Sequence, residues 1–344
     1  NLKPERIDEI EFGIEGRFFN NRLTMDLSIY NKKTNDLIID RPLDPSTGYT
    51  STQTNIGLIE NKGAELDLSM NWFESQDGLN WTSSFNWSTN DAIVIDLGED
   101  TDRIVFAGFG TLGNAAIPGE SLGSIIGSSI TRLGGRIENS RWVDGGDYVV
   151  NNQGSYDETF DPTIIGDANP DWIANLSNTI SYKNLSLNFL FNYQQGGDIF
   201  TYTVATLLGR GLTTDTLDRE LSFVLPGVNS NGQPNTKMIN NSTFYFSNVL
   251  YGPDEMLVYD ASHWRLGEVS LSYNLPKNLI ESTPFGSISI TASGFNLAYN
   301  AWNTPEGTNF DPNIAGVGIG NGRGFDFING PSARRYGGSI KLTF

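Results

Sequence analysis

Residues able to do covalent or metal chemistry are few in this chain and stand far apart. His263 is the only histidine among 344 residues, and cysteine is absent. Without a second histidine or a thiolate, neither a zinc site nor a Ser-His-Asp triad has a recognisable set of partners. We therefore interpret His263 as a structural residue at the start of a strand. We expect no catalytic residue, no metal site and no cofactor.

Two further segments resemble ligand sites at first sight. Asp96, Glu99, Asp100 and Asp102 could bind a cation, but no ligand spacing or turn glycine accompanies them, so a solvated loop is favoured. Residues 316–324 (GVGIGNGRG) are as rich in glycine as a phosphate-binding loop. Their spacing fits neither the dinucleotide-binding nor the Walker pattern, and no helix is expected after them. We predict a flexible loop there.

Aromatic side chains in long loops offer binding chemistry instead. Exposed rings can stack on sugars or pack against peptide side chains. Five candidates stand in such loops: Trp142, Tyr148, Tyr156, Trp302 and Phe325. The alternative, in which these rings pack the loops against each other, is favoured over ligand contact.

The composition excludes several classes of protein. A hydrophobic content of 38% with a mean hydropathy of -0.29 excludes a helical membrane protein, and no run approaches the ~20 apolar residues of a spanning helix. The chain carries 22 basic and 40 acidic residues, net -18, which makes nucleic acid a poor partner. The absence of cysteine also excludes a disulfide framework.

The elements that must position these side chains are strands, and the clearest pair lies between residues 176 and 193. The second run of this pair has one apolar face, formed by Leu185, Leu187, Phe189, Phe191 and Tyr193. A soluble β-sandwich could use such a pair, but each run has about ten residues, the length of a tilted membrane-spanning strand. The opposite face is small and uncharged, as in a watery lumen. We therefore predict a transmembrane antiparallel β-barrel.

The same alternation recurs along the whole chain. Nine runs show it, at residues 10–18, 23–30, 64–72, 79–88, 176–182, 185–193, 268–275, 287–292 and 339–344. Short turns and long loops alternate between them, as in outer-membrane barrels with tight periplasmic turns and long extracellular loops. Aromatic residues near the short turns fit an interfacial girdle. Within the loops, residues 200–208 predict a short helix and residues 244–251 a strand.

Nine strands do not close a barrel of adjacent antiparallel strands, because such barrels have even strand numbers. No signal peptide is present and the chain opens on Asn1, which suggests a mature chain or an internal fragment. We expect residues 1–344 to be the C-terminal part of a larger barrel whose plug domain is absent from this chain.

Six segments match one family's pattern in the family's order. They are residues 2–23 (opening LKPE, then EIEFG and FFNNRL), 55–65 (NIGLIENKGAE), 166–172 (GDANPDW), 259–276 (YDASHWRLGEVSLSYNLP), 293–297 (SGFNL) and 335–344 (RYGGSIKLTF). In these segments the chain resembles the C-terminal barrel portion of SusC/RagA-type TonB-dependent outer-membrane transporters, over essentially its whole length.

The resemblance implies a barrel of about 22 strands with a plug, in the outer membrane of a Gram-negative bacterium. It implies TonB-dependent import of a nutrient, an oligosaccharide or a peptide. Its partners would be outer-membrane lipids, a SusD-like surface lipoprotein and, through a missing N-terminal part, the TonB complex. Phe344 would belong to the terminal strand that the assembly machinery reads. The family's Asp-rich segment is thin here, with Asp157 and Asp161 only, so a loop calcium site is not supported.

Four charged residues on strands would then face the lumen: Glu65, Asp67, Arg265 and Glu268. They could line the transport path or pair with a plug. Three other functions remain as alternatives. A passive porin or scaffold barrel would lack a plug. An outer-membrane barrel enzyme is disfavoured by the isolated His263, and a soluble β-sandwich adhesin would have shorter strands and charges on both sheet faces.

Overall fold

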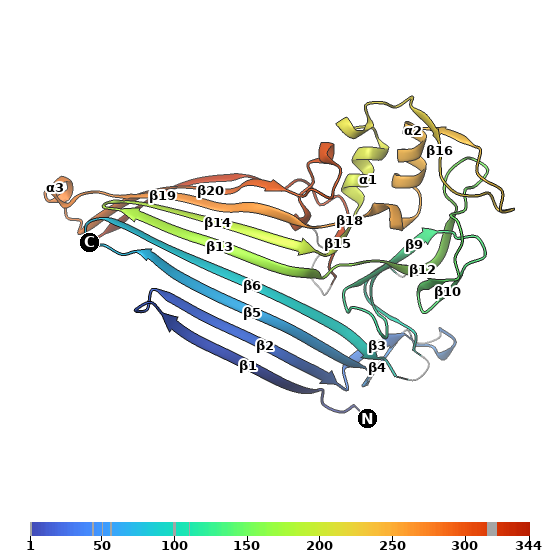
Figure 1. Cartoon of the computed structure of the whole chain (residues 1–344), viewed down its shortest axis with the longest axis horizontal. Helices are drawn as coiled ribbons and strands as arrows, with labels where there is room; N and C mark the ends of the chain where they lie inside the picture. Colours follow the sequence, from blue (N-terminus) through green and yellow to red (C-terminus); the bar gives the residue numbers. More distant parts are fainter. Residues whose placement is uncertain are drawn as a thin grey trace.

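In the part of the chain that the structure describes, an antiparallel sheet of nine strands dominates (Figure 1). The computed structural model describes residues 2–42, 45–49, 51–55, 57–98, 101–109, 111–314 and 322–344. Strands follow one another in chain order, and each pairs with the next: β1 (Arg6–Phe18), β2 (Leu23–Asn35), β5 (Leu58–Phe73), β6 (Leu79–Asp96), β13 (Pro170–Tyr182), β14 (Leu185–Gly196), β19 (His263–Asn274), β20 (Ser287–Asn300) and β22 (Arg335–Thr343). All nine predicted strands are confirmed.

The strands are longer than the alternating runs that predicted them, reaching 18 residues in β6. Their short turns lie at one end of the sheet and the long loops at the other (Figure 1). At the tightest turn, Lys183 takes a positive φ of 52° between β13 and β14. We number the long loops from the N-terminus: the first (residues 36–57), the second (97–169), the third (197–262) and the fourth (301–334).

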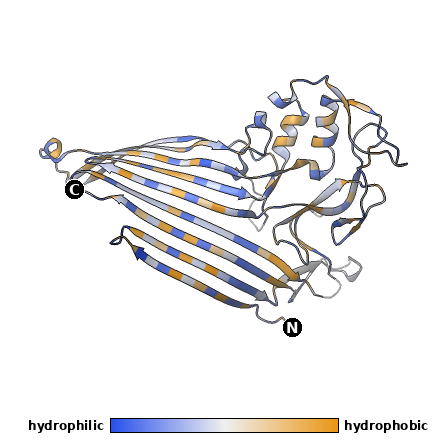
Figure 2. Ribbon diagram, in the orientation of Figure 1, coloured by the Kyte–Doolittle hydropathy of each residue, from blue (hydrophilic) through white to orange (hydrophobic). Residues whose placement is uncertain are grey.

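The two faces of the sheet differ in polarity, and Figure 2 shows the alternation along the strands. Leu187 pairs with Ile180 and Leu271, and Leu185, Phe189 and Phe191 continue the apolar face along β14. The large residues of this face are exposed, for example Phe12 (75%) and Ile340 (67%). Exposed apolar side chains in continuous rows are expected where lipid is the solvent.

One polar group on the apolar face is satisfied within the sheet. The Asn178 Oδ1 accepts hydrogen bonds from Trp81 Nε1 (2.9 Å) and Ser83 Oγ (2.5 Å). Trp72 Nε1 donates to the same Ser83 hydroxyl at 2.9 Å. Asn178 is 5% exposed, and its side-chain oxygen is satisfied by these two donors within the sheet.

The long loops contain strands and helices of their own. The strands are β3 (Ile38–Pro42), β4 (Ser51–Asn55), β7 (Ile104–Phe109), β8 (Leu112–Ala116), β9 (Ser124–Ile130), β10 (Arg136–Glu138), β11 (Arg141–Val143), β12 (Glu158–Asp167), β15 (Asp198–Thr201), β16 (Ser222–Val224), β17 (Met238–Asn240), β18 (Val258–Asp260) and β21 (Phe325–Asp326). The α-helices are α1 (Tyr202–Gly209), α2 (Asn241–Phe244) and, at the short-turn end, α3 (Lys277–Ile280). Short 3-10 turns occupy Pro45–Thr47, Thr214–Thr216, Asp254–Leu257, Glu306–Thr308 and Pro312–Ile314. No helix among the described residues is long and apolar enough to span a membrane.

Two loop predictions had different outcomes. Helix α1 confirms the helix predicted at residues 200–208. The strand predicted at residues 244–251 is wrong, because α2 runs directly into a π-helical turn, Tyr245–Leu250. This helical segment packs against α1, and Val249 and Leu250 are buried in that contact. The apolar residues of the segment thus follow a helical face.

The second, third and fourth loops pack together into one loop domain. Its core joins Ile125 of the second loop, Phe200 and Val204 of the third, and Phe310 and Phe325 of the fourth. Strand β15 pairs in parallel with β21, with Phe200 opposite Phe325. Two carboxylates also bind an edge of β9: Ser128 N donates to Asp254 Oδ2 (3.0 Å) and Ile130 N to Glu255 Oε2 (3.1 Å). The second and third loops are therefore hydrogen-bonded as well as packed.

Candidate functional site

A polar row crosses seven adjacent strands on the face opposite the apolar one. Its members lie at directly paired positions of β1, β2, β5, β6, β13, β14 and β19, namely Glu15, Asp26, Asp67, Asn86, Asn175, Asn192 and Arg265. Side chains of the row contact each other: Asn86 Nδ2 donates to Asp67 Oδ1, and Asn192 Nδ2 donates to Asn175 Oδ1 at 2.6 Å. The row runs from acidic through neutral to basic, so charge changes around the wall.

The acidic part of this face is hollowed. One hollow, of about 660 Å³, is lined by Glu15, Asp26 and Asp67, and an adjoining one of about 480 Å³ adds Glu11 and Glu65. In the described part of the chain, none of these five carboxylates forms an ion pair. They are free to attract cations from solvent. The predicted lumen residues Glu65 and Asp67 both lie here.

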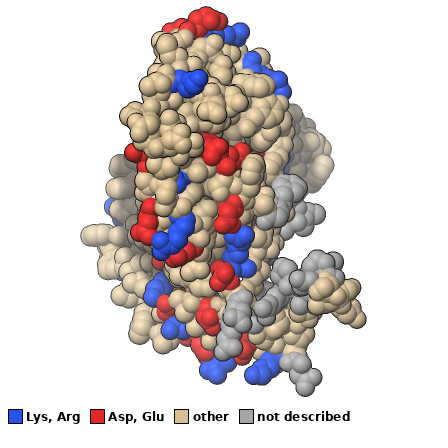
Figure 3. Space-filling model, turned by 90° about the vertical axis from the view of Figure 1, so that its right-hand side faces the viewer, with Lys and Arg blue, Asp and Glu red and all other residues tan. Residues whose placement is uncertain are grey.

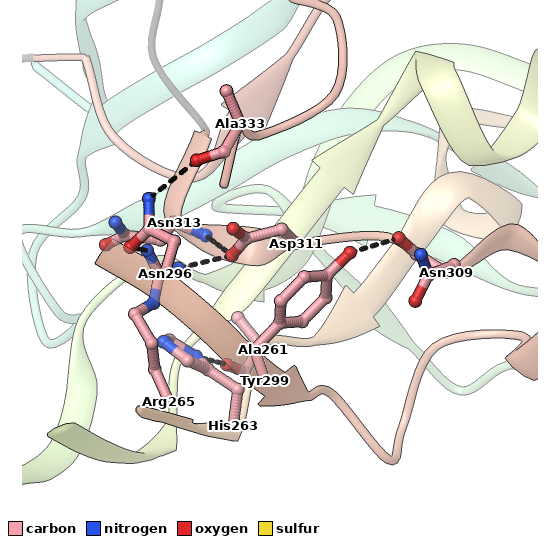
Figure 4. Close-up of polar contacts among 9 residues, drawn as sticks. All are labelled: Ala261, His263, Arg265, Asn296, Tyr299, Asn309, Asp311, Asn313 and Ala333. Carbon is pink, nitrogen blue, oxygen red and sulfur yellow. Dashed lines mark hydrogen bonds and ion pairs between the residues drawn. The ribbon is translucent and has the colours of Figure 1, made fainter. Parts of the chain in front are cut away.

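The basic end of the row is a buried network at the fourth loop (Figure 4). Arg265 and Asp311 form an ion pair between side chains that are only 7% and 1% exposed. Arg265 Nη1 also donates to Asn296 Oδ1 (3.2 Å), and Asn313 N donates to Asp311 Oδ1 (3.1 Å). A buried guanidinium needs such a partner. Arg265 therefore ties the strand wall to the fourth loop of the same chain.

The remaining predicted residues of this face lie beside that network. His263 begins β19, as predicted, and its Nδ1 donates to the Ala261 carbonyl oxygen at 2.8 Å. His263 is buried, and this bond to the backbone is a structural contact. Glu268 lies on the same face of β19, next to a register shift after Leu266. No group of three or more His, Asp or Glu side chains in the described residues is arranged to hold a metal ion.

Three of the predicted loop aromatics lie together in the second loop. Trp142 Nε1 donates to Ser129 Oγ at 2.8 Å. The guanidinium carbon of Arg132 lies 5.9 Å from the Trp142 ring centre and 5.5 Å from that of Tyr148. Tyr148 and Tyr156 meet edge to face at 5.7 Å. These contacts are of the packing kind, and a ligand role for the three rings stays a prediction.

The other two aromatics lie elsewhere. Phe325 is 1% exposed in the core of the loop domain, so the prediction of a ligand contact there is wrong: its ring is covered by Phe200 and other core residues. Trp302 packs on Tyr193 (5.8 Å), which stacks on Trp172 (4.9 Å). Tyr193 belongs to the apolar face, so these rings form an aromatic group at its loop end, as in an interfacial girdle. A ligand role for Trp302 stays a prediction.

The acidic cluster at residues 96–102 and the glycine-rich segment at residues 316–324 lie only partly within the described residues. Of the acidic cluster, Glu99 and Asp100 are not described, while Asp96 ends β6 and accepts a hydrogen bond from Gly98 N (3.1 Å). Of the glycine-rich segment, residues 316–321 are not described. The segment leads into the short strand β21, and a helix does not follow it.

Buried titratable groups in the loop domain belong to its packing. Desolvation raises the pKa of Asp254 and of Asp198, although each accepts a backbone hydrogen bond. Burial also raises the pKa of Tyr259 to about 12.

On the loop-end surface, acidic and basic side chains are intermixed (Figure 3). That surface therefore has no single sign of charge.

Sequence reasoning missed the carboxamide part of the row and the partner of Arg265. Asn86, Asn175 and Asn192 each alternate with apolar residues, but pairing between strands cannot be seen in one sequence. Asp311 stands 46 residues after Arg265 in a segment without periodicity. The Asn296 side chain is placed by a positive φ of 54° within β20. None of these signals points to a partner by itself.

One long-stranded antiparallel sheet, polar on one face and apolar on the other, defines a segment of a transmembrane β-barrel. The family model described as "TonB dependent receptor-like, beta-barrel" matches residues 1–190, more than half of the chain. The chain belongs to this family, which is a family of outer-membrane proteins.

Individual relatives agree with this assignment. The chain is 29% identical over 311 residues to TonB-dependent receptor P3 of Formosa agariphila, covering 86% of this chain and 30% of that protein. It is 26% identical over 194 residues to the TonB-dependent receptor SusC of Bacteroides thetaiotaomicron, covering 55% of this chain and 19% of SusC. The chain thus spans about a third or less of the curated relatives it matches.

A solved structure has the same fold. The RagAB peptide transporter superposes with a TM-score of 0.67 over 99% of this chain and 35% of that chain, at 21% sequence identity. The resemblance to SusC/RagA-type transporters is therefore confirmed, and so is the barrel fold class.

Proposed function

We propose that this chain forms part of the wall of a TonB-dependent importer that carries an oligosaccharide or a peptide across the outer membrane. The observation that supports the proposal most is the polar row across seven paired strands. Such a row provides a continuous hydrophilic surface behind an apolar exterior. The relative RagAB is described as a peptide transporter, and SusC as a TonB-dependent receptor. No covalent step is proposed.

A SusD-like surface lipoprotein and the TonB complex would be the protein partners of such an importer. The lipoprotein would meet the loop end, where the loop domain lies (Figure 1). The TonB complex would act through parts of the whole protein other than this wall segment. Outer-membrane lipids would contact the apolar face. The transport path would be lined by four charged residues: Glu65, Asp67, Arg265 and Glu268.

An uptake experiment tests the function. Cells expressing the full-length protein would receive fluorescently labelled oligosaccharide or peptide pools, with and without a protonophore. Active import predicts uptake that stops when the proton gradient collapses and when TonB is inactivated. Uptake that persists under both conditions would instead identify a passive porin.

A pair of variants tests whether the transport path lies on the polar face. Asp67→Lys changes the charge of the central wall and should alter uptake, whereas Asp77→Lys, in an exposed short turn, should not. Equal uptake by both variants at equal surface levels would contradict the assignment of the polar face to the path.

A further inference from the structure

A separate cavity of about 400 Å³ lies at the loop end of the polar face, among β13, β14, β19 and β20. Five of the side chains that line it are carboxamides: Asn175, Asn192, Gln194, Asn296 and Asn313. Its volume is within the range of small-ligand sites, but such sites are mostly apolar, whereas this one is mostly polar. A ligand of this cavity would therefore be held chiefly by hydrogen bonds.

The carboxamides are held from several sides. Asn192 Nδ2 donates to Asn175 Oδ1 (2.6 Å), and Asn296 Nδ2 donates to the Ala333 carbonyl oxygen (3.3 Å). Gly267 leaves room for this arrangement, because a Cβ there would lie 2.5 Å from Asn192 Oδ1. Each carboxamide retains further donor or acceptor capacity beyond these bonds.

The charges around the cavity disfavour an anionic ligand. The positive charge of Arg265 is already paired with Asp311, which is 2% exposed. Glu268 also lines the cavity and, among the described residues, is in no ion pair. The hollows on the acidic part of the same sheet face are lined by five unpaired carboxylates and one arginine, Arg17, so their net charge is negative. An anion entering the cavity would meet negative charge without a free cation.

We propose that this cavity binds an uncharged, polyhydroxylated ligand, such as a segment of a neutral oligosaccharide. The inference rests on the proposed import function and narrows its cargo. A sugar hydroxyl donates and accepts at one oxygen, so it matches a carboxamide, which offers both capacities side by side. A peptide backbone also matches a carboxamide, but it offers only one N–H and one C=O per residue, whereas a sugar ring carries several hydroxyls. The Arg265–Asp311 pair holds the fourth-loop side of the cavity and leaves no free positive charge for the ligand.

Titration calorimetry on the full-length protein in detergent tests the site. The probes are short neutral gluco-, galacto- and xylo-oligosaccharides, polygalacturonate fragments as anions, and alanine and lysine peptides. We expect binding of at least one neutral saccharide and of no polygalacturonate. Asn192→Leu should weaken that binding about tenfold, because a ligand hydrogen bond is lost and a polar group of the ligand is left unpaired.

The matched control is Asn188→Leu, on the same strand and the same face but outside the cavity. It should bind the saccharide like the unmodified protein. A second variant, Glu268→Gln, should allow polygalacturonate to bind, because it removes the free carboxylate. This variant keeps the shape of the side chain and so reports on charge alone.

Three outcomes would overturn the inference: binding of peptides or polygalacturonate only, no binding of any probe, or saccharide binding that Asn192→Leu leaves unchanged. Energy-dependent uptake in cells, measured in parallel, separates this failure from a failure of the import function. Saccharide uptake that stops with the proton gradient but is unchanged by Asn192→Leu would support the importer and contradict the proposed cavity.

Discussion

The sheet and the loop domain of this chain place their large apolar side chains differently, on the outside of the sheet and in the interior of the loop domain. In the sheet, the large apolar side chains point outward and stay exposed, such as Phe12 and Ile340, while amides and carboxylates line the other face. In the loop domain, Phe200, Val204 and Phe325 are at most 1% exposed, as in an ordinary soluble core. The same chain is therefore folded for two solvents, lipid beside the sheet and water around the loops.

The two regions also differ in the distance between partners along the chain. Each sheet strand pairs with its neighbours in the sequence of barrel strands, mostly across a turn or one loop. The loop domain instead joins residues of three loops, such as Phe200 and Phe325. Its stability depends on contacts that form only when all three loops are in place.

Removing a core ring should open the loop domain but leave the sheet intact. Phe200→Ala leaves a cavity in the core and should destabilise the loop domain by about 3–5 kcal/mol. Hydrogen exchange measured by mass spectrometry should rise in α1 and around β21, with little change in β13 or β14. The control Phe160→Ala, at a ring that is 75% exposed, should change the same exchange little. Equal exchange in both variants would contradict the core assignment.

A charge on the outward face should harm the sheet and not the loops. Leu187→Arg, in the row of Ile180 and Leu271, should cost about 2–4 kcal/mol and reduce assembly into the membrane. The folded fraction can be measured by heat-dependent mobility on gels. Asn188→Arg, one residue further on the polar face, should assemble nearly normally. If Asn188→Arg failed and Leu187→Arg assembled, the two faces would have to be exchanged.

A smaller effect should appear with pH, in the loop domain only. The pKa of Asp254 is raised by desolvation, so the folded loops hold its proton more tightly than the unfolded chain does. This contribution to stability is complete below the ordinary pKa of the carboxyl group. It is lost as the pH rises through the raised folded pKa. Asp254→Asn should flatten this dependence.

Hydrogen exchange at the Ser128 amide, corrected for the intrinsic effect of pH, measures the Asp254 prediction, because Ser128 N donates to this carboxylate. The Ser186 amide in the sheet serves as the internal reference. A loop domain that became more stable over the same rise in pH would contradict the assigned direction.

The sheet could be predicted from the sequence because its determinants are local. Alternation places Leu187 and Phe189 on one face whatever their partners are, and Lys183-Asn184 is a turn by its length alone. Even the polar Asn178 in an apolar run was visible as an exception. Its acceptor role toward Trp81 and Ser83 was not, because the register between two strands cannot be read from one chain.

The loop domain and the site network could be predicted only in part. The sequence predicts the helix at residues 200–208, but it also predicts a strand at residues 244–251, because the helical face of that segment exists only against α1. Nothing near Phe325 in sequence signals its partner Phe200, 125 residues earlier, so the sequence leaves ligand contact and the favoured loop packing both open for this ring. The bond between Arg265 and Asp311 is hidden for the same reason. Ligand roles for the remaining loop aromatics and an assembly role for Phe344 stay predictions.

The shared core of the loops has a consequence for how such proteins diversify. Because Ile125, Phe200 and Phe325 come from three different loops, and Asp254 and Glu255 bind the backbone of β9, one loop cannot be exchanged alone without losing its neighbours' contacts. The second, third and fourth loops therefore have to be exchanged together. A chimera that takes all three from one relative and the strands from another should inherit its recognition surface whole.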